Sequence, residues 1–312
     1  MTEHFDVIVV GAGISGIGAA WHLQTHAPDR SYLILEGRDR MGGTWDLFRY
    51  PGIRSDSDMY TLGFAFKPWT KAKAIADGAT ILDYVEETAR ENHIDRHIRY
   101  CHRLTRADWS SAEARWTVRV DRGGEHVEFT CSFLFMCTGY YNYARGFTPE
   151  FAGVADFEGR IVHPQFWTPD VDYAGKRVVV IGSGATAVTL VPELAKQAAK
   201  VTMLQRSPTY IVSQPSHDGI ADWLLEPQDH CLFGLRYDRQ GARQQDHGEQ
   251  GQDADRDRVA EKGGVHRGAA PFTVTSASGS FLAPCDSGRY GITPGASTIV
   301  LSVLARTSSI VS

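Results

Sequence analysis

The sequence predicts an α/β protein with two dinucleotide-binding, Rossmann-like domains, a small β-meander and a C-terminal part that is incomplete or irregular. Two observations predict the domains: an apolar run is followed at once by a glycine-rich loop both at "GAGISG" (11–16) and at "GSGATA" (182–187). Between these loops, strand-like alternation with period two predicts the meander. After about residue 221 no sustained periodicity remains, which predicts the irregular end.

Composition limits the function classes. The 312 residues are 42% hydrophobic and 22% charged, as expected for a soluble globular chain with room for two domains. A formal net charge of -5 leaves no basic surface and argues against nucleic-acid binding. The five cysteines form no CxxC and no metal-ligand spacing, which predicts reduced thiols and no metal site. The sequence does not indicate an oligomeric state.

One apolar stretch, residues 7–21, resembles a signal peptide at first sight. The residues before it are acidic rather than basic, and the stretch is too short to span a bilayer. We therefore predict a cytoplasmic protein with no integral membrane segment.

The first glycine loop predicts a dinucleotide site. A β-branched run at 5–10 precedes it, a helix follows, and the strand-like "YLILE" ends at Glu36. In such a loop Gly11 makes the tight turn, Gly13 lets the backbone approach a pyrophosphate, and Gly16 lets helix and strand pack closely. The helix N-terminus would face the phosphates, and Glu36 would accept hydrogen bonds from a ribose diol. An ordinary βαβ turn with a coincidental Glu is the alternative.

The residues after Glu36 indicate which dinucleotide binds. "RDRMGGTW" at 38–45 places a second glycine pair directly after the acid, where a larger dinucleotide could extend its phosphates and flavin ring. A plain nicotinamide dehydrogenase would be expected to have another helix there. This favours FAD at the first site.

The middle of the chain predicts a helix and a meander. Over "TILDYVEETARENHI" the residues Ile81, Val85 and Ala89 share one helical face. From 98 to 135 apolar and polar residues alternate around the turn "RGGE", and the final run "FLFMCTG" would return to the parallel sheet.

The second loop repeats the first, with an alanine in the third loop position and a different end to the strand that follows. "KRVVVIG" predicts a buried strand, and Gly182, Gly184 and Ala187 occupy the three loop positions. The next strand ends in Gln205 and Arg206 rather than in an acid. A carboxylate would repel a 2'-phosphate, whereas a guanidinium can bind it bidentately, so this site is predicted to prefer NADPH. A solvated arginine at a strand end is the alternative.

Two such sites imply electron transfer from nicotinamide to flavin. A disulfide reductase would need a redox-active cysteine pair, which is missing, so oxygen is the remaining common acceptor. Between the loops, "FEGRIVHPQFW" places Phe157, Gly159, His163 and Trp167 at the spacing FxGxxxHxxxW. This resembles the linker fingerprint of Baeyer-Villiger monooxygenases, a branch of the flavin-containing monooxygenase superfamily. Thr168 stands where that family usually has Pro or Asp, and the similarity runs over about residues 2–221.

The resemblance implies an FAD- and NADPH-dependent monooxygenase. It would insert one oxygen atom of O2 into a ketone to give an ester or lactone, or oxidise the sulfur of a thioether or thioamide. An N- or S-oxygenating flavin monooxygenase, and a truncated nucleotide-binding remnant without catalysis, are the alternatives.

The resemblance also implies site residues. Asp56, which follows "RYPG", is the catalytic candidate, and His163 and Trp167 would couple the domains. The FAD contacts would be Gly11, Gly13, Ser15, Gly16, Glu36, Gly43, Thr44, Trp45, Asp46, Leu47 and Asp56. The NADPH contacts would be Gly182, Ser183, Gly184, Ala185, Thr186, Ala187, Val188, Thr189, Arg206 and Ser207, with Arg54 and Ser55 near the nicotinamide.

The predicted domains are an FAD-binding domain at 1–145, a linker carrying the fingerprint at 146–175 and a partial NADPH-binding domain at 176–224. Residues 225–312 are rich in Gln, Asp, Arg and Gly and low in apolar residues, which predicts a disordered or aberrant tail. A frameshifted end would explain it. "STIVLSVL" is the one strand-like run there.

Overall fold

The computed structural model describes residues 2–207, 209–211, 218–220, 273–276 and 298–301. The chain forms two compact units, one of residues 1–217 with 271–312 and one of residues 218–270. All elements below belong to the first unit. The predicted tail at 225–312 lies almost wholly outside the described residues, so its disorder or aberrant origin stays a prediction, as do the predicted domain boundaries.

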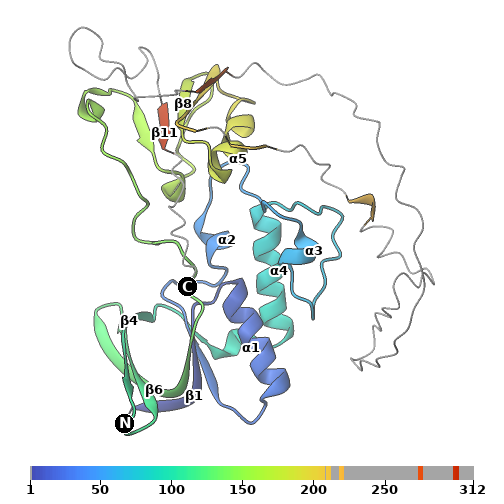
Figure 1. The fold of residues 1–312 in the computed structure, drawn as a ribbon, viewed down its shortest axis with the longest axis vertical. Helices are drawn as coiled ribbons and strands as arrows, with labels where there is room; N and C mark the ends of the chain where they lie inside the picture. The colour runs from blue at the N-terminus through green and yellow to red at the C-terminus, as the bar shows by residue number, and fades with distance from the viewer. Residues whose placement is uncertain (1, 208, 212–217, 221–272, 277–297, 302–312) are drawn as a thin grey trace. The chain divides into compact units, whose positions relative to one another are not determined.

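The first sheet has six strands in the order β3-β2-β1-β6-β5-β4. Strands β1, β6 and β4 of this sheet are labelled in Figure 1. Strands β3, β2, β1 and β6 are parallel, and β6, β5 and β4 form the antiparallel meander predicted from the alternating pattern. The strands are β1 (Glu3–Val10), β2 (Tyr32–Leu35), β3 (Ile98–Arg99), β4 (Arg103–Ser110), β5 (Arg115–Arg122) and β6 (Glu125–Met136).

Strand β6 belongs to both parts of this sheet. Its residues 125–131 pair antiparallel with β5, and its residues 129–136 pair parallel with β1. The predicted return of the chain to the parallel sheet is therefore confirmed, and one continuous strand makes it.

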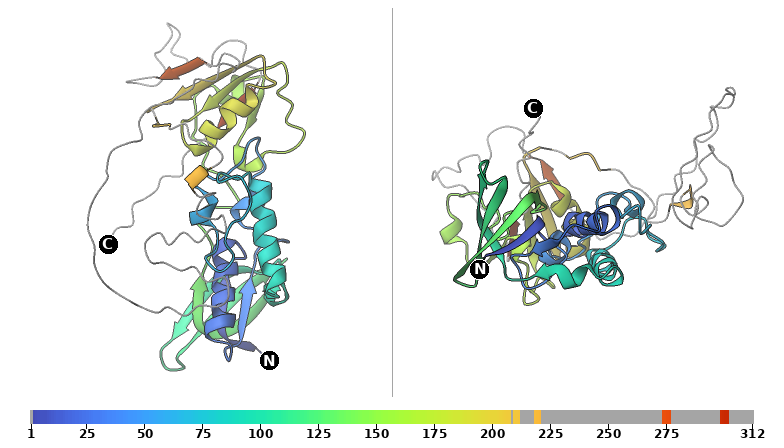
Figure 2. Two further views of the ribbon diagram at one scale, coloured as in Figure 1. Left: turned by 90° about the vertical axis from the view of Figure 1, so that its right-hand side faces the viewer. Right: turned by 90° about the horizontal axis from the view of Figure 1, so that it is seen from below.

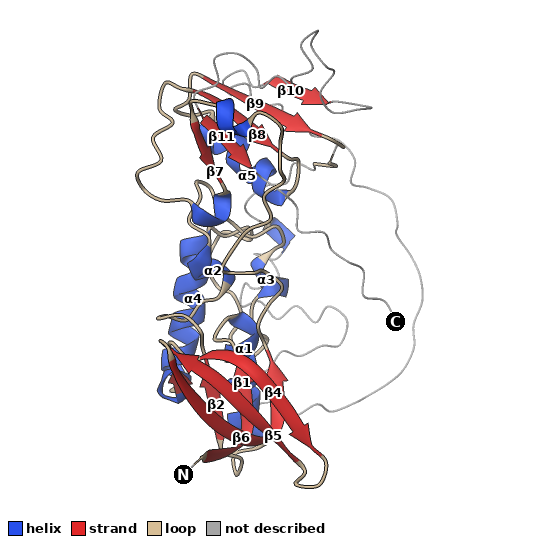
Figure 3. Cartoon of the chain, turned by 90° about the vertical axis from the view of Figure 1, so that its left-hand side faces the viewer, coloured by secondary structure: helices blue, strands red, loops and turns tan. Residues whose placement is uncertain are grey.

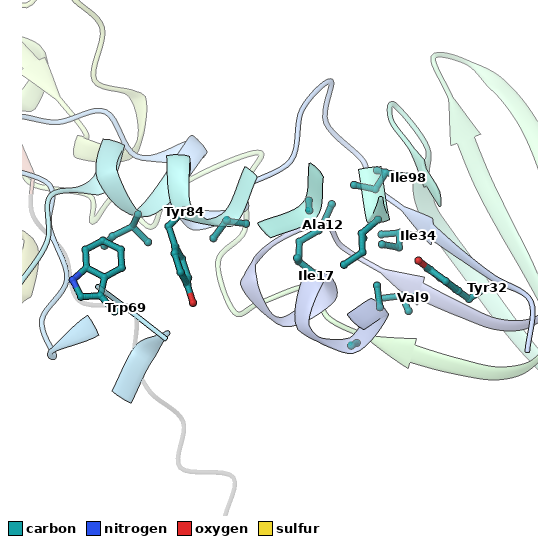
Figure 4. Close-up of a cluster of buried hydrophobic side chains, with 14 of the residues drawn as sticks. Val9, Ala12, Ile17, Tyr32, Ile34, Trp69, Tyr84 and Ile98 are labelled. Atoms are coloured by element: carbon teal, nitrogen blue, oxygen red, sulfur yellow. The ribbon is translucent and has the colours of Figure 1, made fainter. Parts of the chain in front are cut away.

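The helices α1 (Ile14–His26) and α4 (Gly78–Glu91) lie side by side and cover one face of the parallel strands (Figure 2). Asp77 caps α4 by accepting a hydrogen bond from the Thr80 backbone N–H. The predicted apolar face of α4, with Ile81, Val85 and Ala89, is fully buried. Figure 4 shows the core that these helices share with β1 and β2.

The other helical elements before β8 (Arg177–Ile181) are short. They are α2 (Thr44–Leu47), α3 (Met59–Leu62), η1 (Ile94–His97), η2 (Val154–Asp156) and η3 (Pro164–Phe166). No helix within the described ranges is both long enough and apolar enough to cross a membrane.

The second sheet is wholly parallel, in the order β10-β9-β8-β11-β7, with α5 (Ala185–Leu194) packed against it (Figure 3). Its strands are β7 (Arg160–Val162), β8 (Arg177–Ile181), β9 (Lys200–Gln205), β10 (Thr273–Ser276) and β11 (Thr298–Leu301). The strand-like run in the tail thus forms β11, which pairs with both β8 and β7.

Candidate dinucleotide sites

The two glycine loops make the same turn. The Gly11 N–H donates to the Leu35 carbonyl at 2.8 Å, and the Gly182 N–H donates to the Leu204 carbonyl at 2.8 Å. Both glycines have positive φ, +106° and +123°, a region that favours glycine because a side chain would clash there. The loops are therefore structural repeats, each placed between a buried strand and the N-terminus of a helix.

The first loop lies against the second glycine pair through main chain only. The Gly42 N–H donates to the Ala12 carbonyl at 3.0 Å. A Cβ built on Gly43 would lie 3.0 Å from the Gly13 Cα, and one built on Gly13 would lie 3.6 Å from the Gly43 Cα. Because the Gly11, Ala12 and Gly42 N–H groups already donate within the protein, a polyanion would meet the N–H groups that follow, at Gly13 and the start of α1.

Glu36 is buried and holds the first loop in place. One carboxylate oxygen accepts from the Ala12 N–H at 2.8 Å, and the other accepts from the Arg38 N–H at 2.9 Å. Each carboxylate oxygen has a further lone pair, so a ribose diol can still donate to it. The sequence predicted that Glu36 binds a ribose. The structure adds that Glu36 also holds the main chain of the first loop.

Asp46 is the centre of an arginine cluster. Its carboxylate is almost fully buried, lies 2.6 Å from the Arg38 guanidinium, and also accepts from Arg49. Arg40 lies 4.0 Å away. The sequence predicted that Asp46 contacts FAD, but its carboxylate is already paired with Arg38 and Arg49. Asp46 would therefore affect a bound cofactor through the positions of these arginines.

Arg38 was not among the predicted site residues. Its Nη1 is buried and has no hydrogen-bond partner among the described residues. Its guanidinium carbon lies 5.8 Å from the ring centre of Tyr143. The position of Arg38 two residues after Glu36 was the available signal in the sequence. The open donor beside a side-chain-free pair of loops fits the diphosphate and ribose of a dinucleotide.

The other predicted FAD residues surround this cradle. Gly16 is buried in the first turns of α1, and Ser15 is exposed at its start. Gly43 precedes α2 directly, and Thr44, Trp45 and Leu47 are half-buried within it.

The segment "RYPG" contacts the second sheet's helix. Tyr50 is buried and packs in one core cluster with Leu190. A Cβ on Gly52 would lie 2.3 Å from the Glu193 Cγ. The segment that precedes the catalytic candidate Asp56 is therefore also the segment that meets α5.

Arg54, Ser55 and Asp56 follow that segment. Arg54 is exposed, whereas Ser55 is buried and its hydroxyl accepts from the Ala76 N–H at 3.1 Å. Desolvation raises the pKa of the Asp56 carboxyl, and Arg54 opposes this. Asp56 as a residue is exposed to solvent. Its catalytic role stays a prediction.

The second loop differs from the first at the end of its partner strand. Gln205 occupies the position of Glu36, one residue after the carbonyl that receives the glycine N–H, and both side chains are buried. Arg206 follows and is exposed. The Ser183 hydroxyl donates to the Ser207 carbonyl at 2.8 Å and ties the loop to this strand end.

The predicted NADPH residues divide by burial. Gly182, Ser183, Gly184 and Ala185 form the loop and the start of α5, while Thr186 and Val188 are half-buried. Ala187 and Thr189 are buried, so they face the protein interior and would support a ligand only through the backbone.

The fingerprint residues pack on both faces of the second sheet. Phe157 packs against Val179, whereas Trp167 joins the opposite cluster with Val178 and Val180. Gly159 directly precedes β7. The two aromatic residues therefore hold the linker to the sheet from opposite sides.

His163 makes its contacts within the linker. Its Nδ1 accepts from the Gln165 N–H at 3.2 Å, and the Gln165 amide donates to the Asn142 carbonyl at 2.7 Å. The imidazole covers Gly146, where a Cβ would lie 2.1 Å from Cε1. The ring thus fills the space that the missing side chain of Gly146 leaves.

This arrangement predicts a pH-dependent loss of stability. Burial lowers the pKa of His163 below its ordinary value of 6.5, and a hydrogen bond to the Phe147 backbone opposes the shift. As the pH falls through 6.5, His163 binds a proton in the unfolded chain but stays neutral in the folded chain. This difference favours the unfolded state and destabilises the fold. Urea unfolding at pH 8, 7, 6 and 5.5 should show His163→Gln with a flatter dependence than the parent. Parallel curves would contradict this account, because all other histidines are common to both proteins.

Comparisons with known proteins agree with this geometry. The flavin-binding monooxygenase-like family model matches residues 73–231, just over half of the chain, and a NAD(P)-binding Rossmann-like domain model matches residues 9–77. "FAD-containing monooxygenase EthA" of Mycobacterium tuberculosis is 65% identical over 231 residues, which cover 72% of this chain and 47% of that protein.

Two solved structures are similar. A steroid monooxygenase bound to NADP has a TM-score of 0.59 at 36% identity and covers 66% of this chain and 39% of its own. OTEMO in complex with FAD and NADP has a TM-score of 0.57 at 33% identity, and the match covers 67% of this chain and 40% of the OTEMO chain. The predicted fold class and the cofactor pair, FAD with a nicotinamide dinucleotide phosphate, are thus confirmed at the level of relatives.

The chain spans about half the length of the curated relatives it matches. Within that span the matches are nearly continuous from the first glycine loop to beyond the second. The chain therefore belongs to the flavin-binding monooxygenase-like family.

Proposed function

We propose that this chain binds FAD at the first glycine loop and NADPH at the second, in support of the monooxygenation that its family carries out. The observation that carries the proposal is the comparison of the two loops. They share one turn and differ in the third loop position, Gly16 against Ala187, and at one strand end, where buried Glu36 corresponds to buried Gln205 followed by Arg206.

The first site would hold FAD through main-chain groups and a few charges. The N–H groups at Gly13 and at the start of α1 would face the diphosphate, with the helix dipole adding to them. Glu36 would accept from the ribose diol, and the open Nη1 of Arg38 would donate to a phosphate or ribose oxygen. Asp46 would keep Arg38 in place. Bound FAD would supply the redox chemistry, with NADPH as electron donor and O2 as oxygen source.

The second site would select NADPH over NADH. A neutral Gln205 in place of an acid removes the repulsion that a 2'-phosphate would meet, and exposed Arg206 is free to approach that phosphate. The hydrogen bond from the Ser183 hydroxyl to the Ser207 carbonyl would fix the loop beneath the 2'-phosphate.

The substrate class follows from the fingerprint. Its residues from Phe157 to Trp167 favour a Baeyer-Villiger reaction, in which one atom of O2 enters a ketone to give an ester or lactone and the other leaves as water. Oxidation of the sulfur of a thioether or thioamide is the related reaction, and an N- or S-oxygenase is the alternative within the family.

We also propose that the protein is cytoplasmic. The second candidate is a nucleotide-binding fragment without turnover, since the matched segment makes up 47% of the curated relative.

The test is to purify the chain, reconstitute it with FAD, record the flavin spectrum and follow NADPH oxidation with and without a ketone, identifying products by mass spectrometry. Ester formation would exclude the fragment, and bound flavin without product would favour it. No flavin after reconstitution would overturn the proposal for this chain.

A variant tests the second site directly. Arg206→Glu is expected to lower NADPH affinity at least about tenfold while leaving NADH affinity nearly unchanged, because a charge-assisted bond to the 2'-phosphate is lost. Arg177→Ala, an exposed arginine at the start of β8, is the matched control. Isothermal titration with both nucleotides measures this, and an equal loss for both would contradict the assignment of Arg206.

A further inference from the structure

Two histidines lie one turn apart on the exposed side of α1. His22 and His26, in "HLQTH", are both exposed, and side chains four residues apart share one face of a helix. Their ring centres are 5.5 Å apart and their planes differ by 18°. Each imidazole can therefore point one nitrogen at a shared ion about 2.0–2.1 Å away, the length of a bond between zinc and histidine. The same spacing supplies the two histidine ligands of helical zinc motifs.

An aromatic stack holds the two imidazoles in place. Trp21 stacks on Phe66, with ring centres 3.9 Å apart and planes 3° apart. The Trp21 ring meets His22 edge-on at 5.0 Å and His26 edge-on at 6.0 Å, and Phe66 meets His22 edge-on at 5.9 Å. Trp21 and Phe66 are half-buried. Because these neighbours restrict the imidazoles, the entropy cost of bringing both rings to one ion is reduced.

The ring nitrogens of the pair are accessible. Within the part of the chain that the structure describes, no hydrogen bond or ion pair engages either imidazole. Both rings line an open groove of about 600 Å³ over α1, together with Ser15 and Phe64. Water and dissolved ions can therefore reach the pair.

The chemistry of the two ligands selects a class of ion. The cysteine spacings predicted no metal site, and in the described ranges no group of three His, Cys, Asp or Glu side chains could hold an ion. Two histidines can still supply two adjacent coordination positions, with water in the others. Imidazole nitrogens suit Cu²⁺, Ni²⁺ and Zn²⁺, whereas Mg²⁺ and Ca²⁺ require oxygen ligands.

The place of the pair on the helix adds to this attraction. His26 is the last residue of α1, where carbonyl groups without helical partners carry partial negative charge. A cation is favoured at that end. It would also bind the folded helix more tightly than the unfolded chain, in which the spacing of the two rings is not fixed.

We propose that His22 and His26 form a two-histidine binding site for a divalent transition-metal cation of the Cu²⁺, Ni²⁺ and Zn²⁺ class, and that the bound ion stabilises the fold through α1. The site lies at the opposite end of α1 from the first glycine loop. The proposal therefore does not depend on the binding of FAD or NADPH.

The experiment uses the full 312-residue chain without an affinity tag, after a chelator has removed bound metal. Isothermal titration with NiCl2 should show saturable binding, and titration with MgCl2 should show none. NiCl2 should also raise the thermal midpoint of unfolding, because an ion that binds the folded state shifts the equilibrium toward it.

Three variants locate the site. His22→Gln and His26→Gln should each weaken Ni²⁺ binding at least about tenfold and remove the rise in thermal midpoint, because one imidazole alone cannot chelate the ion. His126→Gln changes another exposed histidine, on β6, and should leave both measurements unchanged.

Equal Ni²⁺ affinity in the parent and in both α1 variants would overturn the proposal, as would a loss in only one of the two or a similar loss in His126→Gln. Binding of Mg²⁺ as tight as that of Ni²⁺ would overturn the assigned class of ion. Binding of Ni²⁺ without a rise in thermal midpoint would overturn the stabilisation through α1.

Discussion

Glu36→Gln is expected to abolish retention of FAD and to lower the free energy of unfolding by about 1–3 kcal/mol, although it is nearly isosteric. Both carboxylate oxygens accept main-chain N–H groups, from Ala12 and from Arg38. An amide has one accepting oxygen, so its NH2 group must face one of these donors and leave it unsatisfied in a buried site. The turn that presents the first loop should loosen as a result.

Urea denaturation gives the stability change, and quenching of flavin fluorescence on titration with FAD gives the affinity. Asp39→Asn is the matched control, because Asp39 lies three residues away, is exposed, and accepts from the Arg40 guanidinium at 3.4 Å. A Glu36→Gln protein with unchanged unfolding energy but lost FAD would show that Glu36 serves the ribose alone. Unchanged stability and unchanged affinity would contradict both roles.

The sequence predicted those parts of the structure that local patterns determine. The β-branched runs before Gly11 and Gly182 are strands, because a buried parallel strand needs apolar residues on both faces. The helix with Ile81, Val85 and Ala89 buries that face because the residues recur at helical spacing. The difference between Glu36 and Gln205 was also visible, since the loop glycines fix the position of the strand end that follows.

Contacts between distant segments were not predictable in the same way. Nothing local indicates that Asp46 lies among arginines, or that Tyr143 lies over Arg38 across about a hundred residues of sequence. The opposite placement of Phe157 and Trp167 depends on how the linker crosses the edge of the second sheet. The sequence showed the spacing of the fingerprint, and only the packing shows which surfaces it joins.

Gly16→Ala and Gly13→Ala are expected to separate the two reasons for glycine in the first loop. A Cβ on Gly16 would lie 1.9 Å from the Gly11 carbonyl oxygen, a main-chain atom that cannot move without opening the turn. We expect Gly16→Ala to cost about 1–3 kcal/mol of unfolding free energy, as overpacking does, and to lose FAD as a consequence. A Cβ on Gly13 meets nothing closer than 3.6 Å, and its φ of -83° suits any residue.

Gly13→Ala should therefore keep the parent's thermal midpoint within a few degrees and still lose FAD affinity, because the added methyl group occupies the space between the loops where the diphosphate would approach. The pair serves as its own control, since both changes add one methyl group to the same loop. Thermal unfolding without cofactor, followed by FAD titration, measures both effects. If Gly13→Ala binds FAD as tightly as the parent, the diphosphate does not lie against Gly13. If Gly16→Ala folds with parental stability, α1 can shift to make room for the Cβ. The second loop already accommodates a Cβ at the equivalent position, where Ala187 is buried.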